Sequence, residues 1–203
     1  MSYADLWGPS HITFSQCYNY YLSILDYYSR FIWIFPLKAK SDSLQVFTDF
    51  KNFIEKHLVK RINTVQTDWG GEFISFSLLL TASSIHFRHP CPHIHHQNGK
   101  IERKHRHILT LLAQSNLPLT FWWNAFHTLV FLINKLPTPV LNNVSPYFKL
   151  FHQTPDYSFL RVFGCACYPY LRPYKKHKLE FRTGRCIVIG YSPNHKGYQC
   201  LHF

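Results

Sequence analysis

Acidic residues are scarce in this chain, ten among 203, and three of them have positions that could support metal chemistry. Asp5 lies in an extended apolar segment, Asp68 lies at the end of an expected strand, and Glu102 lies in the first turns of an expected helix. A phosphoryl-transfer site with two Mg²⁺ or Mn²⁺ ions needs hard oxygen ligands that converge from several elements. The three carboxylates therefore predict a metal-dependent phosphoryl-transfer site.

A purely structural explanation exists for each of these acids. An Asp at a strand end is commonly a turn or cap residue, and a Glu in the first helical turn is favoured by the helix dipole. Types and positions alone therefore leave both explanations open.

The elements that must position these acids follow from hydrophobic periodicity and from turn residues. Residues 18–25 and 30–37 predict a hairpin, and 44–58, after a possible cap at 41–43, predict an amphipathic helix. The further expectations are strands at 62–67, 85–87, 160–168, 186–191 and 198–201, and helices at 100–114, 120–136 and 146–151, the last capped by Ser145. This order predicts an α/β fold with a mixed sheet flanked by helices, followed by a small β module.

Composition narrows the class of protein. Lys and Arg number 22, the net charge is +12 and 46% of residues are hydrophobic, which favours a folded protein with a polyanionic partner such as nucleic acid. Basic residues gather at 100–106 and, between aromatics, at 172–185, although both clusters could be solvated faces. Six dispersed cysteines predict reduced, mostly buried thiols in an intracellular protein. The sequence contains no apolar run long enough to span a membrane and no leader-like segment, so no membrane partner is expected.

Several strings, in order, resemble the integrase core of copia-type LTR retrotransposons. The strongest are Thr67-Asp68-Trp69-Gly70-Gly71-Glu72-Phe73, Cys91-Pro92-His93 and Gln97-Asn98-Gly99-Lys100-Ile101-Glu102-Arg103-Lys104. Asp5-Leu6-Trp7-Gly8-Pro9, Leu25-Asp26-Tyr27-Tyr28-Ser29-Arg30-Phe31 and Leu132-Ile133-Asn134-Lys135-Leu136-Pro137 are similar to other segments of that core. Residues 160–165, 186–192 and 196–198 resemble the retroviral polymerase SH3-like module that follows it.

The resemblance implies a ribonuclease H-like core at 1–154, with its first strand clipped, and an incomplete SH3-like module at 155–203. It implies that Asp5, Asp68 and Glu102 are the catalytic triad and hold two Mg²⁺ or Mn²⁺ ions. The implied activity is processing of DNA 3′ ends and their transfer into a target duplex. Element ends and target DNA are thus the implied partners, the active form is a homo-oligomer, and the location is the nucleus or a cytoplasmic particle.

Residues around the expected catalytic helix are candidates for DNA contacts. Cationic side chains there would meet phosphates, and Arg106 lies one helical turn beyond Glu102 on the same face. The expected DNA-binding set is Gln97, Asn98, Lys100, Arg103, Lys104 and Arg106.

The sequence also departs from the family pattern. Trp69, Tyr27 and His96 replace Asn, Asp and Gln that are common there, but none of them is an expected ligand. Only four residues precede Asp5, so the register of the first strand is at risk, and an upstream zinc domain is expected but not present in these residues. The 203-residue chain is therefore expected to be a fragment with weak catalysis or none.

Three other interpretations remain. The chain could be a non-catalytic nucleic-acid-binding remnant, or a ribonuclease H-like nuclease that cleaves without joining. Cys91, His93, His95 and His96 could bind zinc, but no second ligand pair follows at a suitable distance. Cys165-Ala166-Cys167 is better explained by strand packing than by redox chemistry, and no Gly-rich loop predicts ATP or NAD.

Overall fold

The computed structural model describes residues 1–12, 18–67, 71–88, 112–171, 177, 179, 181–192 and 195–202. The chain divides into two compact units. The first contains Met1–Lys104 and Ile133–Pro155, and the second contains His105–Leu132 and Asp156–Phe203. Helix α4 (Trp122–Lys135) contributes residues to both units.

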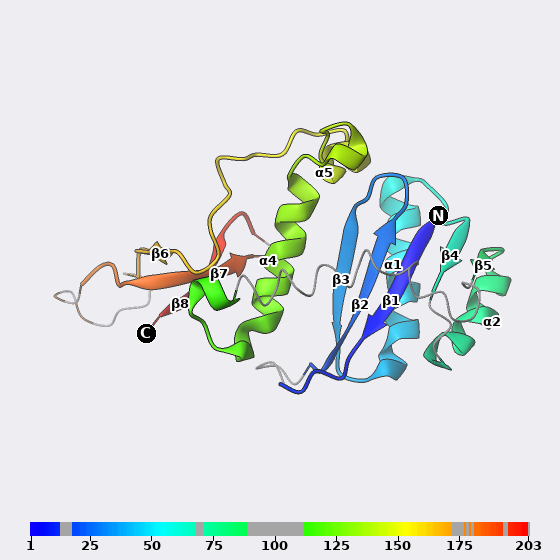
Figure 1. The fold of residues 1–203 in the computed structure, drawn as a ribbon, viewed down its shortest axis with the longest axis horizontal. Coiled ribbons are helices and arrows are strands. Elements are labelled where there is room, and N and C mark those ends of the chain that lie inside the picture. Colours follow the sequence, from blue (N-terminus) through cyan, green and yellow to red (C-terminus); the bar gives the residue numbers. More distant parts are fainter. Residues whose placement is uncertain are drawn as a thin grey trace. The chain divides into compact units, whose positions relative to one another are not determined.

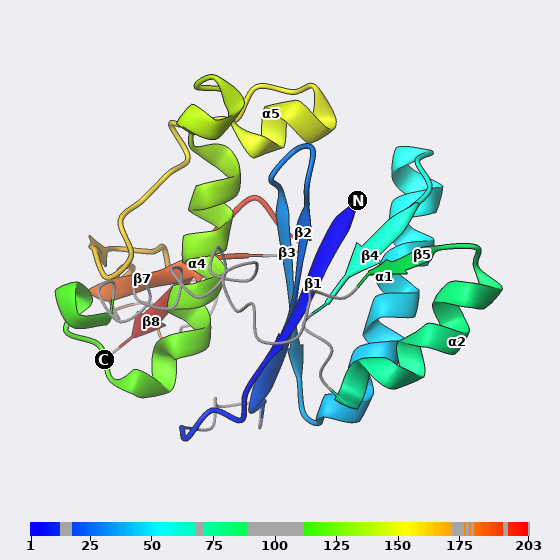
Figure 2. The same cartoon turned by 45° about the vertical axis from the view of Figure 1, so that its right-hand side comes forward.

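The first unit is built on a five-stranded mixed sheet in the order β3-β2-β1-β4-β5 (Figures 1 and 2). β1 pairs antiparallel with β2, which pairs antiparallel with β3, whereas β4 lies parallel to β1 and β5 parallel to β4. The strands are β1 (Ser2–Trp7), β2 (Tyr20–Asp26), β3 (Ile32–Leu37), β4 (Thr64–Gln66) and β5 (His86–Arg88). The expected hairpin and mixed sheet are thus confirmed.

The first strand keeps its register although only four residues precede Asp5. All six residues of β1 pair with β2, from Ser2 opposite Asp26 to Trp7 opposite Tyr21. The backbone N–H of Tyr27 donates to the carbonyl of Met1 at 2.9 Å, which continues the ladder to the first residue. The pairing of β1, whose register the sequence placed at risk, is therefore continuous with β2 from Ser2 to Trp7.

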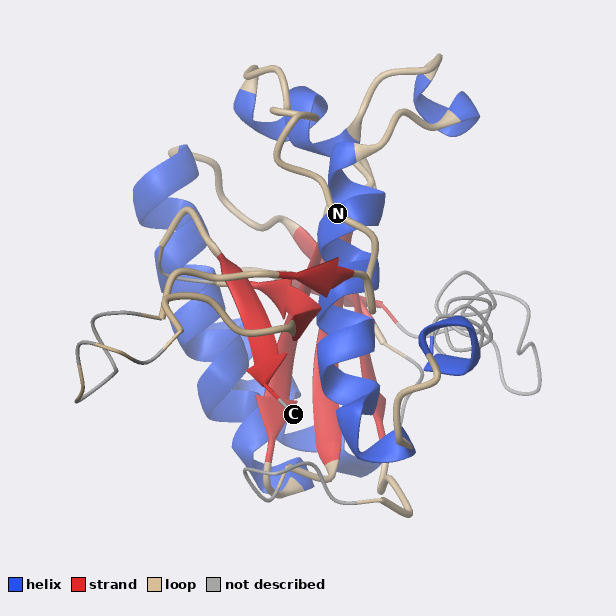
Figure 3. Cartoon of the chain, turned by 90° about the vertical axis from the view of Figure 1, so that its left-hand side faces the viewer, coloured by secondary structure: helices blue, strands red, loops and turns tan. Residues whose placement is uncertain are grey.

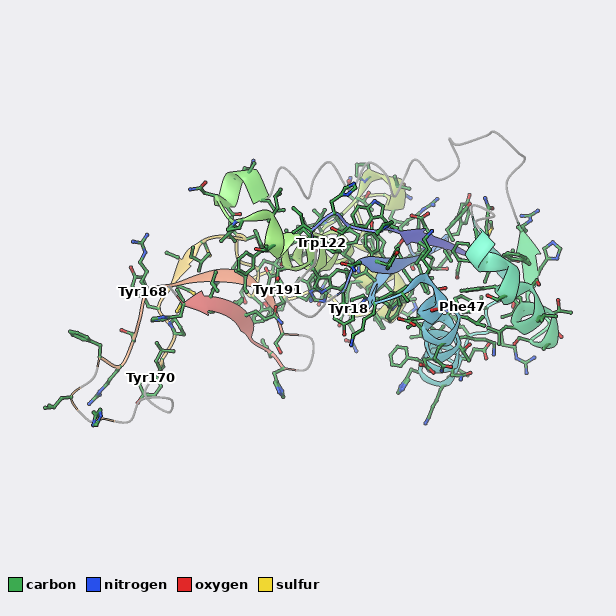
Figure 4. The ribbon with its side chains drawn as sticks, turned by 90° about the horizontal axis from the view of Figure 1, so that it is seen from below. Tyr18, Phe47, Trp122, Tyr168, Tyr170 and Tyr191 are labelled. Carbon is green, nitrogen blue, oxygen red and sulfur yellow. The ribbon has the colours of Figure 1, made fainter. Side chains whose placement is uncertain are left out.

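Helix α1 (Ser43–Leu58) supplies much of the core of this unit. Its residues Phe47, Phe50 and Ile54 are buried at the expected helical spacing, and Figure 4 shows where Phe47 lies. Asp42 lies at the N-cap position of α1 but makes no capping hydrogen bond to the helix. Its carboxylate accepts instead from the Ala39 N–H at 3.0 Å. A 3₁₀ turn, η1 (Lys40–Asp42), precedes the helix instead.

Short helices complete the first unit. After the 3₁₀ turn η2 (Gly71–Phe73), helix α2 (Ile74–Ala82) buries Phe76 and Leu80 completely, and it packs beside β5 (Figure 2). Helix α5 (Pro146–Phe151) follows η5 (Pro139–Leu141) and has the expected cap, since the Phe148 N–H donates to the Ser145 hydroxyl at 3.1 Å.

The second unit contains η4 (Leu119–Phe121), most of α4 and a three-stranded antiparallel sheet in the order β6-β7-β8. β7 (Cys186–Tyr191) and β8 (Tyr198–His202) occupy the expected positions. β6 (Ala166–Cys167) is much shorter than the expected strand at 160–168, and Figure 1 shows loop before it; Figure 3 draws all loops in tan. No helix in the described ranges is long and apolar enough to cross a membrane.

Tyr191 holds together the core of the second unit. It is 1% exposed and its ring stacks on Phe131 at 3.9 Å between centroids. Its hydroxyl accepts from the Arg161 N–H at 2.8 Å and donates to the Arg161 carbonyl at 3.0 Å. These bonds satisfy the buried phenol and fasten the loop at 159–163, which explains why this loop is ordered without forming a strand.

Candidate active site

Asp5 projects from the central strand β1, away from the hydrophobic core. Ala4 and Leu6 are buried in the core cluster, and since side chains alternate along a strand, Asp5 lies on the opposite face of the sheet. The residue is half-buried, and its Cα partner across the antiparallel ladder is Ser23 of β2. The Ser23 hydroxyl donates to the Asp5 carbonyl at 3.4 Å, a long bond that contributes little to the position of the strand.

Aromatic side chains form the surroundings of Asp5 on this face. The rings of Trp7 and Tyr21 stack with centroids 5.3 Å apart. Burial, together with the nearby Asp5 carboxylate, raises the pKa of Tyr21 well above its ordinary value. Tyr21 therefore stays protonated, and the charge of Asp5 acts through a poorly screened, partly apolar environment in which a cation would be attracted more strongly than in water.

β4 runs parallel to β1 and leads toward the second expected ligand. Ser2 lies beside Val65 and Tyr3 beside Gln66, which is the last residue of β4. Thr67 is 1% exposed, and its N–H donates to the Arg88 carbonyl at 3.2 Å. The chain is thus held firmly up to the residue before Asp68.

Asp68 itself lies outside the described residues, and so does Glu102. All six expected DNA contacts, from Gln97 to Arg106, also fall outside them, as do the four residues of the alternative zinc site. Within the described ranges, no group of three or more His, Cys, Asp or Glu side chains is arranged to hold a metal. Of the expected triad, the structure therefore places Asp5 alone.

Residues 168–171, before the second basic cluster, and 181–183, within it, form the two sides of an arm between β6 and β7. Tyr170 bridges to Thr183, and the Leu171 N–H donates to the Arg182 carbonyl at 2.7 Å, so the two sides of the arm are paired. Tyr168 is 66% exposed and Tyr170 59% exposed, and Figure 4 shows them one after the other along the arm. The aromatic side chains are thus available to solvent or to a partner.

The described cysteines are reduced as expected but differ from the sequence expectation in their burial. Among the four that the structure describes, all are free thiols, and Cys186 is the buried one. The sulfur atoms of Cys167 and Cys200 lie 3.5 Å apart. Burial is the main cause, and the Cys200 thiol the second cause, that raises the pKa of Cys167 to about 11. The expectation of mostly buried thiols is therefore wrong for this part of the chain, while Cys167 does lie in a strand as expected.

Sequence reasoning missed the neighbours of Asp5 on β2. Tyr21 and Ser23 were assigned to a hairpin strand but not to the candidate site. The signal that could have identified them is the alternation of the hairpin, since once Asp5 is set opposite Ser23, Tyr21 falls two residues away on the same face.

The chain is similar to known proteins in sequence and in fold. The family model described as "Retroviral polymerase SH3-like domain" matches residues 165–203. The Retrovirus-related Pol polyproteins from transposons RE2 and RE1 of Arabidopsis thaliana are each 45% identical over 98% of the chain. The corresponding polyprotein from transposon TNT 1-94 of Nicotiana tabacum is 31% identical over 97% of it. The chain spans 14–15% of the length of these relatives.

Solved structures are similar in fold. A chain of the simian T-cell lymphotropic virus intasome in complex with PP2A regulatory subunit B56 gamma aligns with a TM-score of 0.53 and 18% identity, covering 99% of this chain and 75% of that one. Together with the mixed β3-β2-β1-β4-β5 sheet flanked by helices, this likeness supports the ribonuclease H-like fold. Almost the whole chain is therefore similar to one segment of these retrotransposon Pol polyproteins, and residues 165–203 match the SH3-like domain of retroviral polymerases.

Proposed function

We propose that this chain is an integrase catalytic core that processes DNA 3′ ends and joins them to a target duplex, with Asp5, Asp68 and Glu102 as metal ligands. One observation carries the proposal, namely the parallel register of β1 and β4. Tyr3 pairs with Gln66, Asp5 follows Tyr3 by two residues, and Asp68 follows Gln66 by two residues. A chain that continued in this register would bring the two carboxylates level on adjacent strands.

The spacing suits a pair of divalent ions. Neighbouring strands lie about 4.8 Å apart, and two-metal sites hold their ions about 3.5–4 Å apart. Asp5 supports the fit, since a half-buried carboxylate beside Tyr21 offers the hard oxygen ligand that Mg²⁺ and Mn²⁺ prefer. When bound, the ions would activate the attacking hydroxyl and stabilise the leaving oxygen. The contribution that the described residues support is the placement of Asp5 on β1, a strand that pairs with β2 along its whole length.

DNA is the partner that this proposal requires. Lys100, Arg103, Lys104 and Arg106 would contact phosphates beside Glu102, and Gln97 and Asn98 would complete the contact surface. The net charge of +12 supports a polyanionic partner, and a homo-oligomer would be the active form. We further propose that residues 1–154 and 155–203 are the two evolutionary modules. The compact units of the structure divide the chain differently, because residues 105–132 belong to the second unit.

Two rival functions require fewer parts. A nucleic-acid-binding remnant would keep the basic surface without binding metal, and a ribonuclease H-like nuclease would use the same carboxylates but produce no joined strands. Metal binding separates the first rival from an integrase core, and analysis of the reaction products separates the second.

Metal binding gives the first test. Mn²⁺ at ten times its dissociation constant should stabilise the chain by about 1.4 kcal/mol, because it binds the folded state alone, and this should raise Tm by about 3–6 °C. The shift should be lost in Asp68→Asn and kept in Asp49→Asn, which removes the same charge from an exposed position on α1. Differential scanning fluorimetry measures both, and an equal shift in the two variants would remove Asp68 from the site.

DNA binding gives the second test. The double variant Arg103→Glu with Lys104→Glu should weaken duplex binding similarly for all sequences, because these side chains are expected to contact phosphates. Its log-log salt slope should be smaller by about 0.9 for each lost phosphate contact. Fluorescence anisotropy at several salt concentrations measures the slope. The matched control is Lys38→Glu with Lys56→Glu, at exposed positions outside the expected surface, and an equal loss in the control would mean that only net charge matters.

A further inference from the structure

A cavity lies in the first unit, at the end of the sheet where β1 begins. Its volume is about 270 Å³. It is enclosed by the start of β1, the turn between β2 and β3, the C-terminal half of α1, the segment that follows α1, and α5. Figure 2 shows α5 and the β2–β3 turn at this same end of the sheet. The lining residues are Met1, Ser2, Asp26, Tyr28, Trp33, Phe50, Ile54, Leu58, Lys60, Arg61, Ile62, Lys149 and Leu150.

The floor of this cavity is apolar and rigid. Trp33 and Phe50 meet edge to face with centroids 5.1 Å apart, and Phe50 is 4% exposed. Ile54 and Ile62 are both 7% exposed and belong to the main core cluster. An occupant would therefore rest on side chains that the core already holds in place, which lowers the entropy cost of binding.

The rim of the cavity is positively charged. Lys60 and Arg61 are exposed, and Lys149 is held with its ammonium 4.7 Å from the centre of the Tyr28 ring. Asp26 is the single acid in the lining, and one of its oxygens already accepts from both the N–H and the hydroxyl of Ser29, at 2.8 and 2.7 Å. Among the described residues, none of the three cations is joined to a carboxylate by an ion pair.

Size and charge together select the occupant. Pockets for drug-sized ligands have volumes of about 300–1,000 Å³, so this cavity suits one large side chain better than a whole cofactor. A DNA backbone would gain from the rim cations but would leave the apolar floor empty. We propose that the cavity anchors an acidic peptide segment of a partner protein, with one aromatic side chain on the Trp33–Phe50 floor and flanking carboxylates at Lys60, Arg61 and Lys149.

A labelled pentapeptide with one tryptophan between two acidic pairs tests this site in the 203-residue chain. Fluorescence anisotropy should detect binding, and replacing the tryptophan by alanine or the acids by lysines should abolish it. The variant Lys60→Glu with Arg61→Glu should reduce affinity about tenfold or more, the scale of close charge pairs at interfaces. Lys56→Glu on an exposed face of α1, outside the lining, should change affinity less than twofold.

A cavity-filling variant tests the contribution of the apolar floor to peptide binding separately from that of the charged rim. Leu58→Trp should block the peptide while leaving duplex binding unchanged, and the exposed charge reversal remains informative if this variant does not fold. The proposal is overturned if the acidic tryptophan peptide does not bind, or if Leu58→Trp folds and binds it normally. It is also overturned if a short DNA duplex displaces the peptide and depends on Lys60 and Arg61, which would assign the rim to DNA.

Discussion

Replacing Asp5 by Asn should reduce Mn²⁺-dependent nicking and joining of DNA ends by at least about 100-fold, the scale on which enzymes lose rate when one preorganised electrostatic group is removed. Asp5 is half-buried on a strand that pairs with β2 along its whole length and with β4 at Ser2 and Tyr3, so its backbone position is fixed. Single-turnover assays on labelled duplex ends measure the effect, both in the 203-residue chain and within a longer polyprotein segment.

Asp68→Asn and Glu102→Gln should have losses of similar size, and the three losses should not add. Ligands of one two-metal cluster act as a unit, since removal of any one already weakens both the activated nucleophile and the stabilised leaving oxygen. Full activity in Glu102→Gln would refute its assignment.

The choice of control depends on contacts that only the structure reveals. Asp49→Asn should retain activity, because this exposed acid of α1 only accepts from the Gln45 amide at 3.0 Å. Asp26 is a poorer control, since its carboxylate holds the β2–β3 turn through the Ser29 N–H and hydroxyl. If Asp49→Asn lost as much activity as Asp5→Asn, the loss would reflect charge or folding and not the proposed site.

Replacing Asn134 by Ala should destabilise the chain by about 2–4 kcal/mol, because it leaves buried backbone groups without partners. The Ile32 N–H donates to the Asn134 side-chain oxygen at 2.9 Å, and the Asn134 side-chain nitrogen donates to the Ile32 carbonyl at 2.8 Å. Asn134 is 6% exposed and β3 is the edge strand at this side of the sheet, so water reaches these groups poorly. Tm should fall by about 4–16 °C.

Asn52→Ala supplies a control of opposite sign. Asn52 is exposed within α1, and Ala has the higher helix propensity, so this variant should be stabilised by a few tenths of a kcal/mol. Urea unfolding followed by circular dichroism compares the two variants. Equal free energies of unfolding would show that the bonds between Asn134 and Ile32 contribute nothing to stability.

Local patterns were sufficient for much of the first unit. The aromatic and β-branched runs predicted β2 and β3, the periodicity of Phe47, Phe50 and Ile54 predicted α1, and the Ser145-Pro146 pair predicted the cap of α5. These patterns predicted the elements correctly because each depends on residues close in sequence. The buried face of a strand or helix follows directly from the spacing of its apolar residues. The motif strings likewise predicted the similarity to retrotransposon Pol polyproteins, which relatives of 45% identity confirm.

The sequence by itself therefore determined the similarity to retrotransposon Pol polyproteins, most strands and helices of the first unit, and Asp5, Asp68 and Glu102 as the candidate ligands, but it did not predict helix α2. Only the tertiary structure decided the register of β1 against β4, the placement of Tyr21 and Ser23 beside Asp5, and the bonding of Asn134 to Ile32, 102 residues away in the chain. The strand expected at 160–168 is present only at Ala166–Cys167. The hydroxyl of Tyr191 bonds to the backbone of Arg161 and holds it in a loop conformation. The physical reason is that long-range pairing and buried hydrogen bonds depend on partners that no local pattern specifies.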